Sequence, residues 1–182
     1  MTTATFQKAD QKPDAGFDYA REVRQVWQDF PLTKDSFYFI DVCASAVVYP
    51  GRQAGEVFEE ARSHFDFPAV GLDISNEIEK LATAKDSGHF SIKGRSFIFL
   101  YTGAHRTSPL SKVATIAQKT FFSFDHELGH ALIPKGAQQV NRNLGECVAD
   151  AYAVIRHFQR YGVGSSAVDG CAENRARNFM FA

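Results

Sequence analysis

The chain has 182 residues, of which 45% are hydrophobic and 23% are charged, and its formal net charge is -1 at pH 7. This length and composition predict one globular domain and exclude a fibrous repeat or a wholly disordered chain. The near-neutral charge provides no basic surface for nucleic-acid phosphates or anionic membranes, so we expect neither kind of partner.

The compartment is indicated by the cysteines and the amino terminus. Cys43, Cys147 and Cys171 are too few for a disulfide framework and favour a reducing environment. The sequence from Met1 to Pro13 has no apolar run after a positively charged start, so it does not resemble a Sec signal peptide. No stretch approaches the ~20 consecutive apolar residues of a membrane-spanning helix. We therefore expect a cytoplasmic protein, with secretion by a route that needs no such signal left open.

The first half of the chain predicts a lead-in and four elements. Residues 1–16 are mostly small and polar, so we expect a flexible lead-in followed by one domain over residues 17–182. Apolar residues at three- and four-residue spacing predict helices, and a run of aromatic and branched residues predicts a strand. In chain order these are a helix at 19–30 before Pro31, a strand at 37–42, a helix at 52–65 and a surface helix at 74–83.

A β-hairpin is predicted over residues 90–101, because two apolar stretches flank a K-G-R turn. The second arm is apolar on both faces. Such a strand either lies inside a sheet or forms an edge with which an extended peptide substrate can pair, and both interpretations stay open. The residues of this arm are Phe97, Ile98, Phe99, Leu100 and Tyr101.

A long helix is predicted from Pro109 to Ile133, with Ser108 as its N-cap and Pro134 beyond its end. A last helix is predicted at residues 144–161. Together these elements predict an α+β fold in which a small, mainly antiparallel sheet packs against the long helix. The stripe expected to pack on the core consists of Val113, Ala117, Phe121, Phe124, Leu128 and Ala131.

The long helix contains the segment H-E-L-G-H, which matches the metal-binding pattern H-E-x-x-H. His126 and His130 lie one turn apart on the face away from Phe124 and Leu128, so both imidazoles can bind one metal ion. Glu127 projects ~100° round the helix axis from His126, where its carboxylate can accept a proton from a metal-activated water. Because the pattern also arises by chance, two surface histidines and a solvated glutamate are the alternative.

The first turns of the last helix contain E-C-V-A-D, in which Glu146 and Asp150 share one helical face. H-E-L-G-H followed on the next helix by E-x-x-x-D resembles the gluzincins, the thermolysin-like zinc metallopeptidases. The resemblance covers His126 to Tyr161. It implies a zincin-like domain that binds one Zn²⁺ per chain through His126, His130 and Glu146, with Glu127 as the general base. It also implies that Asp150 holds the imidazole of His126.

Other interpretations of the second motif stay open. Asn143 followed three residues later by Glu146 also matches a capping-box helix start. Asp150 is the alternative third ligand, as in zincins that use an aspartate. Cys147 points ~100° away from Glu146 on a helix, so we expect a buried small residue rather than a metal thiolate.

The sequence departs from the larger gluzincins: only 36 residues follow Glu146, so we expect neither their carboxy-terminal subdomain nor its substrate-polarising histidine. It is therefore either a minimal version or a truncated piece. A replacement oxyanion donor would be His157, Tyr152 or Tyr161, although each of these is also a typical packing residue.

The function expected from these residues is zinc-dependent hydrolysis of a peptide or protein substrate. One alternative is a zinc hydrolase that acts on non-peptide amides. Another is a non-catalytic zinc-binding or protein-interaction module, and a third is an interaction domain with a chance motif. The sequence indicates no particular oligomeric state.

Overall fold

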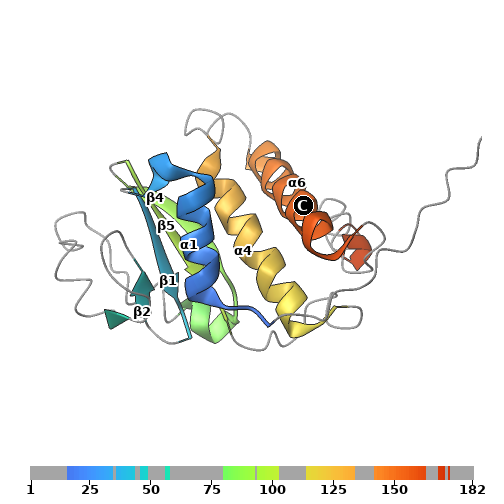
Figure 1. The fold of residues 1–182 in the computed structure, drawn as a ribbon, viewed down its shortest axis with the longest axis horizontal. Helices are drawn as coiled ribbons and strands as arrows, with labels where there is room; N and C mark the ends of the chain where they lie inside the picture. The colour runs from blue at the N-terminus through green and yellow to red at the C-terminus, as the bar shows by residue number, and fades with distance from the viewer. Residues whose placement is uncertain are drawn as a thin grey trace, which may run out of the picture.

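The computed structural model describes residues 16–34, 36–43, 46–48, 56–57, 80–92, 94–102, 114–133, 142–162, 168–170 and 172. Within these residues the chain has an α+β fold, as predicted, in which helices pack on one face of a small sheet (Figure 1). None of the helices in this part of the chain is long and apolar enough to cross a membrane. The elements are α1 (Tyr19–Asp29), the 3-10 helix η1 (Pro31–Thr33), β1 (Phe37–Asp41), β2 (Ala46–Val48), β3 (Glu56–Val57), β4 (Gly88–Ile92), β5 (Arg95–Leu100), α4 (Ile116–Leu132) and α6 (Arg142–Tyr161).

The sheet is mainly antiparallel, with strand order β3-β2-β1-β5-β4. β1 and β5 pair in parallel, with Phe39 opposite Ile98, and the other three pairings are antiparallel. β5 therefore lies between two strands that already use its backbone hydrogen-bonding groups. The interpretation of residues 97–101 as a substrate-binding edge is wrong, and the interior interpretation holds. β4 is the outer strand beside it.

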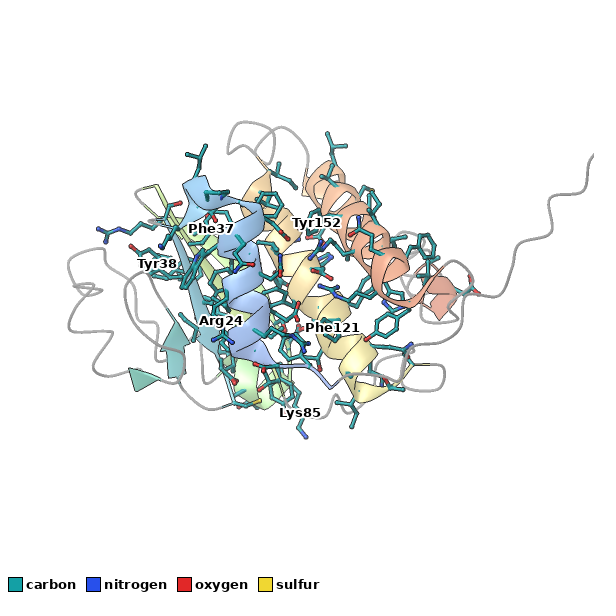
Figure 2. The ribbon with its side chains drawn as sticks, in the orientation of Figure 1. Arg24, Phe37, Tyr38, Lys85, Phe121 and Tyr152 are labelled. Carbon is teal, nitrogen blue, oxygen red and sulfur yellow. The ribbon has the colours of Figure 1, made fainter. Side chains whose placement is uncertain are left out.

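Alternation along β1 and β5 explains why both strands are apolar on both faces. One face, with Phe39 and Ile98, packs against α1 and α4, and Trp27 of α1 contacts Phe39 with ring centroids 6.0 Å apart. On the other face, the buried ring of Phe97 stacks on Tyr38 at 5.4 Å. Figure 2 labels Phe37, which belongs to the first face, and Tyr38, which belongs to the second. The buried cluster consists of Val23, Val26, Phe37, Phe39, Ile98, Leu100, Phe124 and Leu128.

Several predicted elements have the expected places. The observed bounds of α1, β1, the hairpin β4–β5 and α6 differ from the predicted ranges by no more than two residues at either end. The predicted helix at 52–65 is wrong at Glu56 and Val57, which form β3 and pair with β2. Of the predicted helix at 74–83, the described part is helical over residues 80–84. The predicted flexible lead-in lies outside the described residues, apart from Gly16.

The long helix starts later than predicted. α4 begins at Ile116, and Thr115 is its N-cap, whereas Ser108 and Pro109 lie outside the described residues. The Thr115 side chain accepts a hydrogen bond from the backbone N–H of Gln118, whose own side chain accepts from the backbone N–H of Thr115. This reciprocal capping box satisfies two amide groups that would otherwise lack partners. The sequence signal for this helix start is the T-x-x-Q pattern of residues 115–118.

α4 and α6 cross at close range because the residues between them are small. A Cβ atom built on Gly129 would lie 2.8 Å from the Cα atom of Ala149, closer than side-chain atoms approach a backbone. Ala149 and Ala153 are fully buried on the facing side of α6. The glycine of H-E-L-G-H is therefore required by the helix crossing, and this crossing brings the start of α6 beside the two histidines of α4.

Candidate metal centre

Three side chains from α4 and α6 converge on one point. The Nε2 atoms of His126 and His130 are 3.1 Å apart. Glu146 Oε2 lies 3.6 Å from His126 Nε2, and Glu146 Oε1 lies 3.5 Å from His130 Nε2. Ligand atoms around a tetrahedral ion with bonds of ~2.05 Å would be ~3.3 Å apart. The three residues therefore have the spacing needed to hold a metal ion, and all three are partly exposed.

The position of Glu146 decides between the interpretations of the second motif. α6 begins at Arg142, so Asn143 lies inside the helix and is not the N-cap of a capping box that would include Glu146. The Glu146 carboxylate instead faces both histidines of α4. Cys147 is exposed, so the expectation of a buried cysteine was wrong. Its exposure follows from the ~100° rotation per residue, which turns Cys147 away from α4.

Asp150 lies behind His126, on the side opposite the metal-facing nitrogen. Its Oδ1 atom is 2.8 Å from His126 Nδ1, which makes it a hydrogen-bond partner of the ring. Burial lowers the pKa of His126, but the hydrogen bond to Asp150 and the nearby carboxylates of Glu127 and Glu146 raise it, and the net pKa is above the usual value. This bond fixes Nδ1 as the protonated nitrogen and leaves the lone pair of Nε2 directed at the candidate metal position.

Glu127 is partly buried on α4 and belongs to the surroundings of the centre, not to the ligand cluster. Its charge contributes to the raised pKa of His126, so its carboxylate is close to the imidazole. A carboxylate in this position, adjacent to the ligands yet separate from them, can act as an acid or base toward a molecule held at the centre.

A buried network of charges fixes the two site helices behind the ligands. Asp125, next to His126 in the chain, is 1% exposed and accepts hydrogen bonds from the Arg160 guanidinium of α6. Arg160 also contacts Glu22 of α1 at 3.4 Å. Its guanidinium carbon lies 4.4 Å from the centroid of the Phe121 ring. These contacts tie α1, α4 and α6 together, which holds the histidines in register with Glu146.

The three residues of α6 considered as oxyanion donors contact aromatic rings or the hydrophobic core. His157 is 1% exposed and contacts the rings of Phe122 and Tyr161, and burial together with Arg160 lowers its pKa to about 4. Tyr161 also contacts Phe121 near the first turns of α4. Tyr152 packs against the core cluster (Figure 2), and burial raises its pKa to about 12. These ring contacts, and the contact of Tyr152 with the core cluster, are packing contacts.

One residue near the centre was missed from the sequence. His89 of β4 has its ring nearly parallel to that of His130, with an interplanar angle of 8° and 6.3 Å between centroids. The sequence signal was present but weak, since His89 and Ser91 alternate with Phe90 as a polar face of the hairpin. The partner of that face is a helix far along the chain, which periodicity does not reveal.

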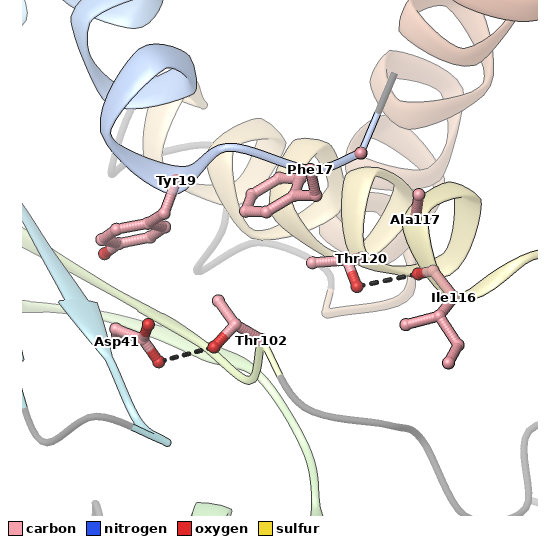
Figure 3. Close-up of a pocket in the computed structure, with 8 residues that line it drawn as sticks. Phe17, Tyr19, Asp41, Thr102, Ile116, Ala117 and Thr120 are labelled. Atoms are coloured by element: carbon pink, nitrogen blue, oxygen red, sulfur yellow. Dashed lines mark hydrogen bonds between the residues drawn. The ribbon is translucent and has the colours of Figure 1, made fainter. Parts of the chain in front are cut away.

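A pocket of about 440 Å³ lies at the opposite end of α4 from the histidines (Figure 3). It is lined by Tyr19, Asp41, Thr102 and the first turn of α4. In it, the Thr102 hydroxyl donates a 2.9 Å hydrogen bond to Asp41. Thr120 of this pocket precedes His126 by six residues, which is ~9 Å along a helix axis. The pocket is therefore separate from the metal ligands.

Comparisons of the chain with protein-family models, with curated proteins and with solved structures found no match.

Proposed function

We propose that the protein is a zinc-dependent hydrolase that cleaves peptide bonds. The observation that carries this proposal is the triangle of His126 Nε2, His130 Nε2 and the Glu146 carboxylate, with separations of 3.1 to 3.6 Å. Two imidazoles and one carboxylate are a common donor set of catalytic zinc. The resemblance of the two helical motifs to gluzincins supports the same assignment, and so does the small sheet packed on the motif helix.

The number of ligands favours a catalytic centre over a closed structural one. Among the described residues, the cluster that could hold an ion has three members. A structural zinc site usually has four protein ligands, whereas a catalytic site keeps one position for water or substrate. When bound, Zn²⁺ supplies Lewis-acid polarisation of a carbonyl group and a lowered pKa of water, to about 7.

The residues of the chain supply the proton transfers. Glu127 accepts a proton from the attacking water and then donates it to the nitrogen of the leaving amine. Asp150 holds His126 in one tautomer through the 2.8 Å contact to Nδ1. The resulting order of events is water deprotonation, attack on the carbonyl carbon, and cleavage of the C–N bond as the amine takes up the proton.

A peptide fits the surroundings of the centre better than a small amide does. β4 is the outer strand of the described sheet, and its His89 lies against His130 of the ligand triangle. An extended peptide can pair with an outer strand through main-chain hydrogen bonds, which would run it past the metal ligands. The substrate-binding strand proposed here is thus residues 88–92, in place of residues 97–101.

The test is cleavage of unfolded protein by the zinc-loaded chain. Reduced and alkylated casein is incubated with the wild type and with Glu127→Gln, and new peptide termini are counted by mass spectrometry. We expect cleavage by the wild type, and a rate reduced at least ~100-fold in Glu127→Gln, because a general base contributes about that factor. Glutamine has the same size as glutamate, and Glu127 is not one of the proposed metal ligands, so the zinc content of Glu127→Gln should be unchanged.

Equal cleavage by both proteins would contradict the role of Glu127. A wild type that binds zinc and cleaves no peptide bond would contradict the peptidase assignment and favour an amide substrate of another class.

A further inference from the structure

The sheet contributes His89 to the surroundings of the ligand triangle, which consists of His126, His130 and Glu146. Its register partner is Ile98, whose side chain belongs to the core cluster that packs on α4, so His89 projects toward the same helix. The ring is partly buried and lies parallel to that of His130, with 6.3 Å between the two centroids. The three ligands all come from α4 and α6, so His89 approaches the centre from a different element.

The spacing of His89 indicates a neighbour of the ligands and not a fourth ligand. The ligand atoms of His126, His130 and Glu146 lie within 4.8 Å of one another, and His89 is not a member of this cluster. A fourth tetrahedral ligand would place its nitrogen ~3.3 Å from each of the other ligand atoms. His89 is therefore near enough to contact His130, yet outside the cluster. A group bound at the remaining metal position would occupy the space between His89 and the ligand triangle.

A pair of serines orients the His89 imidazole. Ser91 Oγ lies 3.4 Å from His89 Nε2 and 3.2 Å from Oγ of the buried Ser96. When Ser91 donates to Nε2, the proton of the neutral ring is on Nδ1, which makes that nitrogen a hydrogen-bond donor. Both serines lie on the face of the hairpin that carries His89, so the contact is built into the strand pairing.

We propose that His89 is a catalytic residue that donates a hydrogen bond to the scissile carbonyl oxygen of the substrate as negative charge develops on it. This inference rests on the proposed hydrolase function. It gives the chain an oxyanion donor from the outer strand β4 in place of His157, Tyr152 and Tyr161, which contact aromatic rings or the core cluster. A donor held by a strand is also positioned before substrate binds, which is the condition for effective stabilisation of developing charge.

The experiment compares wild type, His89→Ala, His89→Asn and the control Phe90→Leu, all loaded with zinc. Phe90 belongs to the same strand but stacks on Phe97, on the opposite face, so its replacement tests for general disturbance of β4. Zinc content is measured by elemental analysis. The dissociation constant of acetohydroxamate, which binds zinc through its two oxygens, is measured by calorimetry. Where casein cleavage has identified a peptide substrate, kcat and KM are measured for it.

We expect one zinc per chain in all four proteins. In His89→Ala the dissociation constant for acetohydroxamate should rise ~10-fold, and kcat should fall ~100-fold with little change in KM, as for loss of one oxyanion donor. His89→Asn keeps an N–H donor and should recover part of both losses. Phe90→Leu should resemble the wild type.

Unchanged acetohydroxamate affinity and unchanged kcat in His89→Ala would overturn the proposal. Loss of zinc in His89→Ala would also overturn it, because His89 would then be a ligand. If the wild type binds zinc and acetohydroxamate but cleaves no peptide, the peptidase function fails. In that case, if His89→Ala binds acetohydroxamate with the same dissociation constant as the wild type, the proposal for His89 fails too. A wild type that binds no zinc would contradict both.

Discussion

The Cα atom of Ala149 lies 2.8 Å from the point that a Cβ atom on Gly129 would occupy. This approach between α4 and α6 sets the distance from the two histidines to Glu146. The site therefore depends on a residue that contacts neither metal nor substrate. Two glycines of the same pair of helices allow a direct comparison, because Gly145 of α6 has no atom within 4 Å of its Cβ position.

Gly129→Ala should force α4 and α6 apart. We expect a loss of about 1–3 kcal/mol in the free energy of unfolding, as for overpacked cores, and weaker zinc binding because the ligand triangle widens. Gly145→Ala should keep zinc affinity and gain up to about 1 kcal/mol, since alanine favours helix. Urea unfolding in a chelator and zinc competition titration measure the two effects. Similar results for both variants would show that the crossing is not a close one.

Asp150→Asn should weaken zinc binding without removing a ligand. Asparagine cannot supply the negative charge that supports His126 through the 2.8 Å contact to Nδ1. Partners of this kind typically change metal affinity 10–100-fold, so we expect a decrease of about that size. Competition with a chromophoric chelator measures it, and Asp169→Asn, at an exposed aspartate, is the control. Equal affinities in the two variants would contradict the role of Asp150.

Arg160→Met should destabilise the fold, because Asp125 is 1% exposed and would lose its main hydrogen-bonding partner. Removing one member of a buried ion pair costs about 3 kcal/mol or more. In contrast, Arg21→Met removes an ion pair to Glu22 in which Arg21 is 49% exposed, and exposed pairs contribute only about 0–1 kcal/mol. Urea unfolding of both variants tests the difference. A smaller loss in Arg160→Met than in Arg21→Met would contradict the account.

The buried His157 should make stability depend on pH. Its pKa is about 4 in the folded state against 6.5 in the unfolded state, so the unfolded state binds more protons between these values. The stability provided by the neutral ring is therefore complete above pH 6.5 and is lost as the pH falls toward 4. At pH 5 the loss is ~2 kcal/mol, from 1.36 kcal/mol per pH unit.

His157→Leu has a side chain of similar size that does not titrate. The free energy of unfolding is measured with a chelator present, at pH 7 and pH 5, so that zinc loss does not contribute. Wild type should lose ~2 kcal/mol more than His157→Leu between the two pH values. Parallel decreases in the two proteins would show that His157 is not held neutral by its surroundings.

Local patterns predicted much of the fold and the residues of the candidate metal cluster. H-E-x-x-H places two histidines one turn apart, and Glu146 and Asp150 share a face, because helix periodicity alone decides both relationships. The hairpin and the stripe at Phe124 and Leu128 follow from periodicity in the same way. Each of these features depends on residues within about two turns of one another, which a single sequence displays directly.

Long-range relationships were not predictable in the same way. The Asp125–Arg160 pair and the His89–His130 contact join elements that are distant in sequence. The parallel pairing of β1 with β5 also depends on tertiary packing, and this pairing is what makes β5 an interior strand and leaves β4 as the outer strand of the described sheet. The prediction that failed at Glu56 and Val57 shows the related limit, since helix propensity at these two residues yields to strand pairing with β2.

The most direct test is the zinc content of protein purified without added metal, measured by elemental analysis in wild type, Glu127→Gln, His126→Ala and Glu146→Ala. We expect about one zinc per chain in the first two proteins and much less in the last two, because only two of the three proposed ligands remain in His126→Ala and in Glu146→Ala. No zinc in the wild type, even after zinc is supplied, or equal zinc in all four, would contradict the proposed centre and with it the hydrolase.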